Sequence, residues 1–293
     1  KISLKLFFKM NIFDSNIHLP CNSKVDLSKY MFLHESPMSL KDMLNEDLNM
    51  TYKNLSNCFS KYLDTIKNNS NGCNIMIFSS KITPDELKLF VSTVRTKIKN
   101  SYFSMLINPK ENISMEKLSE YKNAGLTAIK FHGYIHKISK ENFESVVNIS
   151  LNAQILKMPI LVDSSYGGLS MYKYKSIELI SYILEKVTKV PVVILHSGGA
   201  KAIEALLLAD ACKNVYLDTS FSVPYYLGSS VEKDLAFAYK KIGTNRVLYG
   251  SDFPYVDIVD SFENTSKFLE LNNFSEKDCE SILSKTSNDI FFK

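Results

Sequence analysis

Eight short apolar segments, each followed by sequence with a helical pattern, constrain the fold of this chain more than any other feature. Their side chains are apolar at nearly every position, which is typical of parallel strands whose two faces are both covered. The segments span residues 12–19, 74–79, 102–107, 127–132, 159–163, 191–196, 215–218 and 246–252. Eight strand–helix units in 293 residues predict an α/β fold, a (β/α)8 TIM barrel in a single domain.

Helix signals separate these strands. Thr83 and Pro84 predict a helix start, and Gly125 predicts a helix stop. The expected helices span about 51–68, 83–99, 114–124, 141–157, 175–189, the stretch after Gly199, 231–242, 260–272 and 275–285. Residues 20–50 are polar and predict a covering loop with short helices. An open doubly wound sheet is the alternative, but no GxGxxG turn follows the first strand.

Composition limits the class of partner. Lys and Arg outnumber Asp and Glu by 35 to 31 without a basic block, which argues against nucleic acid. No apolar run reaches the ~18 residues that a membrane span needs. Five cysteines without a CxxC pair favour a reduced, cytoplasmic protein. We therefore expect a small-molecule substrate, with a homo-oligomer left open. We interpret residues 1–9 as an N-terminal extension and 10–293 as the barrel.

Polar side chains recur where the apolar strands end, and in such barrels the strand ends carry the active site. Asn16 and His18 lie two positions apart and therefore project to one face of the strand. The same spacing joins Lys130 and His132. The other strand-end residues are Asp163, His196, Asp218 and Asp252.

Several of these strand-end segments resemble the amidohydrolase superfamily, in the branch that includes aminocarboxymuconate-semialdehyde decarboxylase and dicarbonyl-compound lactonases. The similar segments are Phe13-Asp14-Ser15-Asn16-Ile17-His18, Ala128-Ile129-Lys130-Phe131-His132, Leu195-His196-Ser197-Gly198-Gly199, Leu217-Asp218-Thr219-Ser220, Gly250-Ser251-Asp252-Phe253-Pro254 and Asn288-Asp289-Ile290-Phe291. The resemblance implies a divalent metal held by histidines and an aspartate. His18, His196 and Asp252 match that pattern, whereas Asn16 and Asp163 stand where the family has histidines.

The resemblance also implies roles for individual residues. One zinc, manganese or iron ion would be bound by His18, Asp163, His196 and Asp252. Asp252 would take a proton from the attacking water, and His196 would polarise the substrate carbonyl. Lys130 would bind an anionic group, form a metal-bridging carbamate or act as a Schiff-base lysine. Asn16, His132 and Asp218 complete the predicted substrate site.

Each of these residues also has a structural interpretation. Asp163 suits the capping of the turn that follows it, Asn16 suits an amide that fixes His18, and Lys130 suits a side chain that reaches solvent. Three functions therefore remain open. The first is a metal-dependent hydrolase of a C–O or C–N bond in a small carboxylated or cyclic substrate. The others are a metal-independent, lactonase-like hydrolase and an inactive barrel retained for binding.

Overall fold

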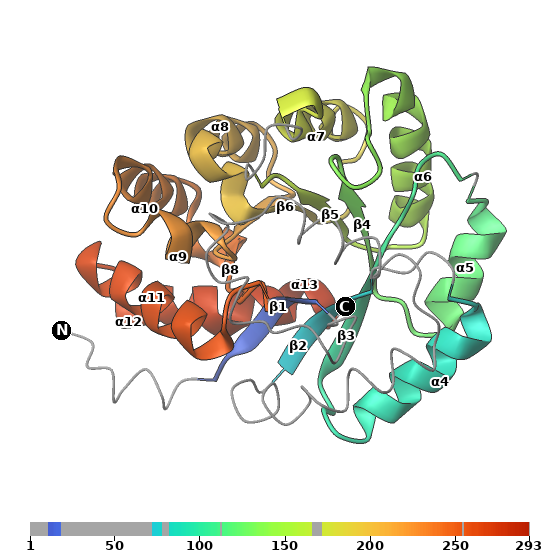
Figure 1. Cartoon of the computed structure of the whole chain (residues 1–293), viewed down its shortest axis with the longest axis horizontal. Coiled ribbons are helices and arrows are strands. Elements are labelled where there is room, and N and C mark those ends of the chain that lie inside the picture. Colours follow the sequence, from blue (N-terminus) through green and yellow to red (C-terminus); the bar gives the residue numbers. More distant parts are fainter. Residues whose placement is uncertain are drawn as a thin grey trace.

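The computed structural model describes residues 11–18, 72–77, 82–111, 113–165, 172–253 and 255–292. Eight parallel strands lie side by side in chain order and form a ring that the helices surround (Figure 1). The strands are β1 (Phe13–His18), β2 (Gly72–Ile77), β3 (Ser101–Leu106), β4 (Ala128–His132), β5 (Ile160–Asp163), β6 (Val192–Leu195), β7 (Val215–Asp218) and β8 (Val247–Leu248). The predicted TIM barrel is confirmed.

The ring closes between β1 and the chain that follows β8. Ser15 N–H donates to the carbonyl oxygen of Tyr249 at 2.9 Å, and His18 N–H donates to that of Phe253 at 2.6 Å. Asp252 N–H donates to the carbonyl oxygen of Asn16 at 2.9 Å. These bonds continue the sheet past the two residues of β8 and fix the backbone of Asp252 against β1.

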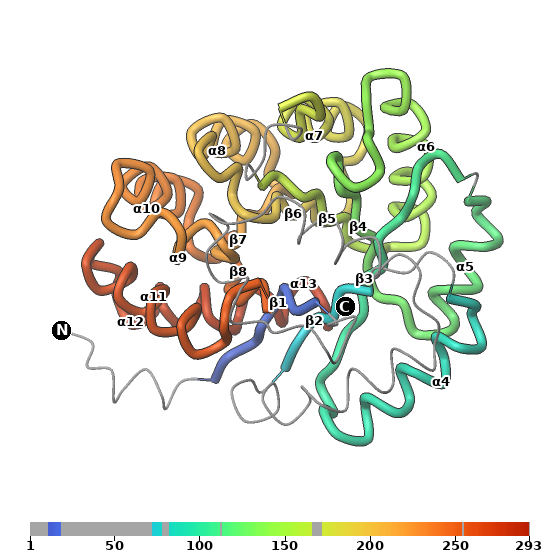
Figure 2. Tube along the Cα trace, viewed as in Figure 1, coloured from blue at the N-terminus to red at the C-terminus, as the bar shows by residue number. Residues whose placement is uncertain are grey.

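Helices follow the strands around the outside of the ring, as the tube in Figure 2 traces. They are α4 (Pro84–Arg95), α5 (Met115–Asn123), α6 (Phe143–Ile155), α7 (Ser176–Leu184), α8 (Ala202–Ala211), α9 (Ser222–Tyr226), α10 (Ser230–Ile242), α11 (Ile258–Leu271), α12 (Glu276–Glu280) and α13 (Thr286–Phe291). Thr83 begins α4 with the predicted cap, since its hydroxyl and the Glu86 side chain bond reciprocally to backbone N–H groups.

Two apolar clusters fill the barrel. The larger packs the outer faces of the strands against the helices. The smaller lies within the ring and joins inward-facing strand residues such as Leu161 and Val193 to Ile290 and Phe291 of α13. The rings of Phe13 and Phe291 stack with centroids 5.7 Å apart, so α13 closes the end of the barrel at which β1 begins. The polar residues are thereby left for the opposite end.

Some predicted boundaries were wrong. The eighth strand ends at Leu248 rather than at residue 252, because the N–H of Tyr249 donates to the carbonyl oxygen of Ile282 at 2.8 Å instead of to a strand. The last helical segment continues beyond residue 285 as α13, since Ile290 and Phe291 are needed to close the barrel. Helix α9 was missed. The predicted extension at 1–9, the loop at 20–50 and the helix at 51–68 lie outside the described residues.

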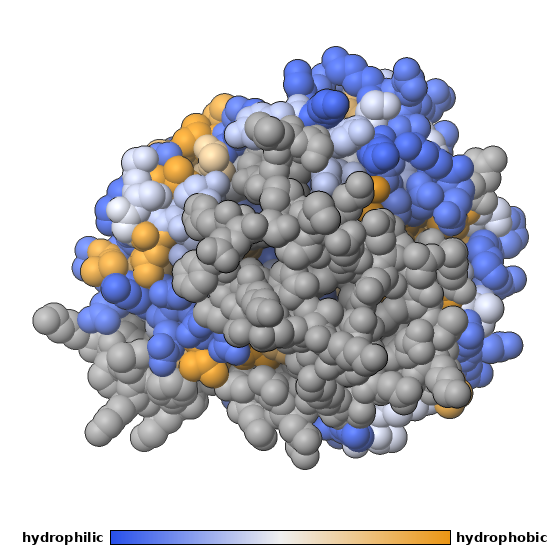
Figure 3. Space-filling view, viewed as in Figure 1, coloured by the Kyte–Doolittle hydropathy of each residue, from blue (hydrophilic) through white to orange (hydrophobic). Residues whose placement is uncertain are grey.

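The outer surface is mixed in character, with apolar side chains scattered among polar ones in the visible face (Figure 3). Ile203 and Leu207 on α8 and Phe237 on α10 are among the exposed apolar residues. None of the described helices combines the length and the apolar character that crossing a membrane requires.

Candidate active site

Asn16 and His18 both contact Asp252. The Nδ2 of Asn16 lies 3.2 Å from Oδ1 of Asp252, and the Nε2 of His18 lies 3.1 Å from the same oxygen. All three side chains are buried. Burial, with Lys130 and His196 nearby, lowers the pKa of His18 well below its ordinary value, so the neutral ring donates its Nε2–H to the carboxylate.

The two oxygens of Asp163 have different partners. Oδ1 accepts hydrogen bonds from the backbone N–H and hydroxyl of Ser165, at 3.0 and 2.6 Å, which is the turn-capping role considered for this residue. Oδ2 faces three nitrogens: His196 Nε2 at 3.0 Å, His132 Nε2 at 3.4 Å and Lys130 Nζ at 3.8 Å. Burial opposes its ionisation, but His132, His196 and Lys130 hold the pKa of Asp163 well below its usual range.

Hydrogen bonds fix the protonation of the two histidines beside Asp163. His132 Nδ1 accepts from the N–H of Ile135 at 3.4 Å, so the proton of its neutral ring lies on Nε2. His196 instead has an acceptor at each nitrogen, the carbonyl oxygen of Ser220 at 3.1 Å from Nδ1 and Asp163 at Nε2. Although burial lowers the pKa of His196, Asp163 and Asp252 raise it above its ordinary value, which favours the imidazolium form.

Lys130 is 1% exposed, so the solvent-reaching interpretation of this side chain was wrong. Burial lowers the pKa of Lys130, while Asp163, Asp252 and Asp218 act in the opposite direction and favour its charged form. Asp163 at the end of β5 lies 3.8 Å from its ammonium nitrogen, and the carboxylates of Asp218 and Asp252 act on it electrostatically. A buried cation needs such partners, because an isolated charge in the interior is very unfavourable.

Asp218 joins the same network through Ser220. Asp218 Oδ2 accepts from the hydroxyl of Ser220 at 2.5 Å, and Ser220 Oγ accepts from Nδ2 of Asn16 at 2.9 Å. Burial raises the pKa of Asp218 to about 6, although His196 and Ser220 lower it. Gly250 allows this packing, since a Cβ at that position would lie 2.8 Å from Cβ of Asn16 and 3.1 Å from Cβ of Ser220.

The backbone is strained around these side chains. His196, Ser197, Phe221 and Asp252 have φ values between 50° and 63°, a region that residues with a Cβ rarely adopt. All four follow the carboxyl ends of β6, β7 and β8. Strained residues concentrate at functional sites, where the surrounding structure holds them. Four residues with positive φ therefore surround the candidate site.

The four predicted metal ligands do not converge. They lie as two pairs, His18 with Asp252 and Asp163 with His196. Among the residues that the structure describes, no three His, Cys, Asp or Glu side chains lie together in a way that could hold a metal ion. The ammonium group of Lys130 would also repel a divalent cation beside Asp163. As they stand, these residues do not fit the predicted four-ligand site, and metal binding stays a prediction.

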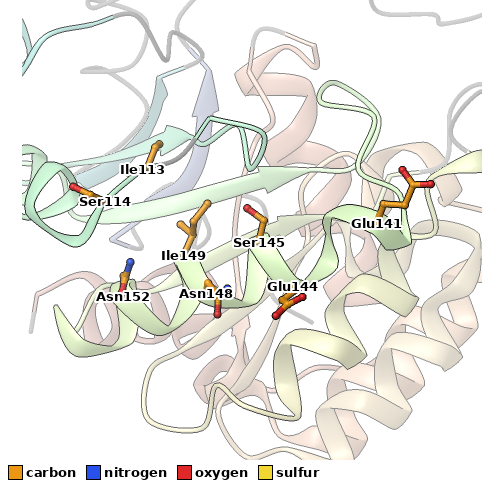
Figure 4. A pocket seen from close by; sticks show the side chains of 8 residues that line it. All are labelled: Ile113, Ser114, Glu141, Glu144, Ser145, Asn148, Ile149 and Asn152. Carbon is orange, nitrogen blue, oxygen red and sulfur yellow. The ribbon is translucent and has the colours of Figure 1, made fainter.

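A surface groove of about 440 Å³ lies away from this network, between the start of α5 and α6. Ser114, Ser145, Glu141 and Glu144 are among the side chains around it (Figure 4). None of the predicted site residues lines it, so the groove is not the candidate active site.

Comparison with known proteins supports the sequence resemblance. Residues 168–293 match the model of the amidohydrolase family. The predicted resemblance to amidohydrolases is confirmed. The matched part of the chain contains His196, Asp218 and Asp252, three of the strand-end residues. No curated protein matches the chain.

Solved structures are similar over nearly the whole chain. A probable 2-pyrone-4,6-dicarboxylic acid hydrolase from Acinetobacter baumannii, solved with citric acid, is 15% identical with a TM-score of 0.62, covering 97% of this chain and 100% of its own. An amidohydrolase from Burkholderia multivorans with bound zinc is 12% identical with a TM-score of 0.61, covering 96% and 99%. A dihydroxybenzoic acid decarboxylase from a Polaromonas species, with manganese and 2-nitroresorcinol, is 11% identical with a TM-score of 0.59, covering 97% of each chain. At these identities the likeness shows the fold.

Sequence reasoning missed two residues of the site. Ser220 links Asn16 to Asp218 through hydrogen bonds. The sequence could have indicated this, because Ser220 follows Asp218 by two positions and such residues share a face of an extended chain. Phe221 lies against His196, with ring centroids 6.2 Å apart. No sequence pattern indicated Phe221, because its position depends on an unusual turn.

Proposed function

We propose that this protein is a hydrolase that cleaves a C–O or C–N bond in a small carboxylated substrate without a metal ion. Buried cations take the part that a metal would have in binding negative charge. The observation that carries the proposal is the position of Lys130, buried, 3.8 Å from Asp163 and under the influence of Asp252 and Asp218. Protonated His196 is the second cation of the site.

Asp252 is the general base in this proposal. His18 and Asn16 hold its Oδ1, which orients Oδ2 toward an attacking water. Burial raises the pKa of Asp252 to about 7, although His196 and Lys130 lower it. A carboxylate with such a pKa can accept the proton of the water and then return it to the leaving oxygen or nitrogen at neutral pH.

Lys130 and His196 bind the negative charge. One cation pairs with a substrate carboxylate, and the other stabilises the oxyanion that forms when water adds to the scissile carbonyl group. Such stabilisation is strong where water is excluded, because the charges act in a medium of low dielectric constant. Asn16 Oδ1 is buried and has no hydrogen-bond donor among the described residues, so it is available to an N–H or O–H group of the substrate.

The named relatives suggest the first compounds to test. The hydrolysis of 2-pyrone-4,6-dicarboxylic acid and of related carboxylated lactones, esters and amides would be followed spectroscopically, with dihydroxybenzoic acids assayed for decarboxylation. We expect hydrolysis of at least one carboxylated lactone, ester or amide and its loss in Asp252→Asn. Release of CO₂ without hydrolysis would overturn the hydrolase assignment, and full activity in Asp252→Asn would overturn the mechanism.

The metal-dependent hydrolase predicted from the sequence remains the second candidate, because structural relatives were solved with zinc and manganese. In that case His18, Asp163, His196 and Asp252, which lie here as two pairs, would have to converge to hold the ion, and the ion would supply Lewis acidity. Elemental analysis of the purified protein and assays with a chelator separate the two candidates. The cytoplasmic location, the homo-oligomer and the extension at residues 1–9 also stay predictions.

A further inference from the structure

Phe221 occupies a turn that a bulky residue rarely adopts. Its φ of 54° and ψ of −51°, with the N–H of Ser222 donating to the carbonyl oxygen of Ser220 at 2.5 Å, define a γ-turn of the rare, strained kind. Glycine would adopt this conformation without strain. A phenylalanine at such a position needs surroundings that hold it.

The residues on both sides of Phe221 hold His196. The carbonyl oxygen of Ser220 accepts from His196 Nδ1 at 3.1 Å, and the hydroxyl of Ser222 donates to the carbonyl oxygen of His196 at 2.5 Å. The turn therefore fixes the Phe221 ring relative to the imidazolium. The two rings meet edge to face, with an interplanar angle of 83° and centroids 6.2 Å apart.

The Phe221 ring is supported on a second side and remains partly exposed. It stacks on the ring of Tyr225, with centroids 5.2 Å apart and planes 16° apart. Two other partly exposed aromatic residues lie beside site histidines, Tyr134 beside His132 and Tyr255 beside His18, with centroids 6.3 and 5.1 Å apart. Rigid aromatic side chains thus adjoin the three site histidines at the ends of β1, β4 and β6.

We propose that Phe221 determines the substrate specificity of this site, by presenting a rigid aromatic wall to the flat, unsaturated part of a carboxylated substrate. This proposal rests on the proposed function, in which Lys130 and His196 bind the carboxylate of the substrate. The flat part then lies against the Phe221 ring, where ring–ring contact favours an aromatic acid over a saturated acid of similar size. Phe221 does not take part in bond cleavage.

The test compares the binding of benzoate and cyclohexanecarboxylate by calorimetry, because these acids carry the same charge and rings of similar size. We expect the wild type to bind benzoate about fivefold more tightly, within the range measured for aromatic pairs. Phe221→Leu should bring the ratio of the two dissociation constants close to one, mainly by weakening benzoate. Phe221→Tyr, which keeps the ring, should restore the preference.

Two further variants make the result specific. Phe237→Leu removes an exposed ring from α10 and should leave the ratio unchanged. Lys130→Met should weaken the binding of both acids by the same factor. Unchanged binding of both acids to Lys130→Met would count against the proposed function. The role of Phe221 would then be judged separately, from the ratio of the two dissociation constants in Phe221→Leu. Equal affinity of the wild type for the two acids, no binding of either, or an unchanged ratio in Phe221→Leu would overturn the specificity role.

Discussion

Lys130 Nζ lies 3.8 Å from Asp163 Oδ2, and only 1% and 6% of these two side chains are exposed. The pair joins the ends of β4 and β5 within the barrel. Removal of one partner from a buried pair leaves the other charge uncompensated, which commonly destabilises a protein by about 3–5 kcal/mol. His196 and His132 also contact Asp163 and reduce that penalty here.

Replacement of Lys130 by Met should therefore decrease both stability and activity. We expect a decrease of about 3 kcal/mol in the free energy of unfolding and a decrease of at least about 100-fold in kcat/KM, since one charge-stabilising group is lost. Urea denaturation and steady-state kinetics measure the two effects. Lys117→Met removes an exposed lysine paired with Glu120 and should change neither. Wild-type activity in Lys130→Met would exclude a role for the buried cation.

The activity should depend on the ionisation of Asp252. Its pKa is raised to about 7, and only the ionised carboxylate accepts a proton. The value of kcat/KM should therefore increase about tenfold per pH unit below pH 7 and level off above it. Measurement of kcat/KM from pH 5 to pH 9 tests this shape. A decrease through pH 7 as the pH rises would show that the essential form is protonated.

Asp14 should make the folded protein less stable as the pH rises. Burial raises its pKa to about 7 from the ordinary 3.8, although it accepts hydrogen bonds from the N–H groups of Ser251 and Asn16. A pKa raised by folding contributes stability below pH 4 that is lost as the pH rises through 7. Three units correspond to at most about 4 kcal/mol.

The variant Asp14→Asn keeps a carbonyl oxygen for those hydrogen bonds and cannot ionise. Its stability relative to the wild type should thus improve between pH 4.5 and pH 8. Urea denaturation of both proteins at the two pH values measures the change. A difference that is the same at pH 4.5 and pH 8 would refute the raised pKa of Asp14.

Gly250→Ala should disrupt the site by crowding. The new Cβ would lie 2.8 Å from Cβ of Asn16, an atom that cannot rotate away, and Asn16 positions Asp252. We expect a loss of about 1–3 kcal/mol in stability and a lower kcat with little change in KM. Gly133→Ala is the matched control, because its Cβ would come no closer than 3.3 Å, to the Ser176 hydroxyl. Equal kinetics for the two variants would contradict the positioning role of Asn16.

The barrel could be predicted from the sequence because each strand and helix is indicated by residues within or next to it. Apolar strands such as the one predicted at 191–196 and cap residues such as Thr83 specify their own elements, and strand ends converge in any barrel of this kind. The joint contact of Asn16 and His18 with Asp252 follows from their spacing of two residues. The fold and the grouping of the polar residues at one end of the barrel could therefore be predicted from the sequence.

The hydrogen-bond and ion-pair partners of each polar side chain could not be predicted from the sequence. Several contacts depend on turns and on distances between strands that the sequence pattern does not encode. They are the contacts of Lys130 with Asp163, of Asp163 with Ser165 and of His196 with Ser220. Those contacts decide whether the polar residues surround a metal or pair with one another. The strained turn at Phe221 also depends on long-range packing, so local propensity could not indicate it.

Metal dependence of the activity tests the central claim most directly. The purified protein would be treated exhaustively with a chelator, its zinc, manganese and iron contents measured by mass spectrometry, and its hydrolytic activity compared with that of the untreated protein. We predict unchanged activity at less than about 0.1 metal ion per chain, since Lys130 and His196 already supply positive charge in the site. Activity that disappears on chelation and returns with one divalent ion would contradict the account.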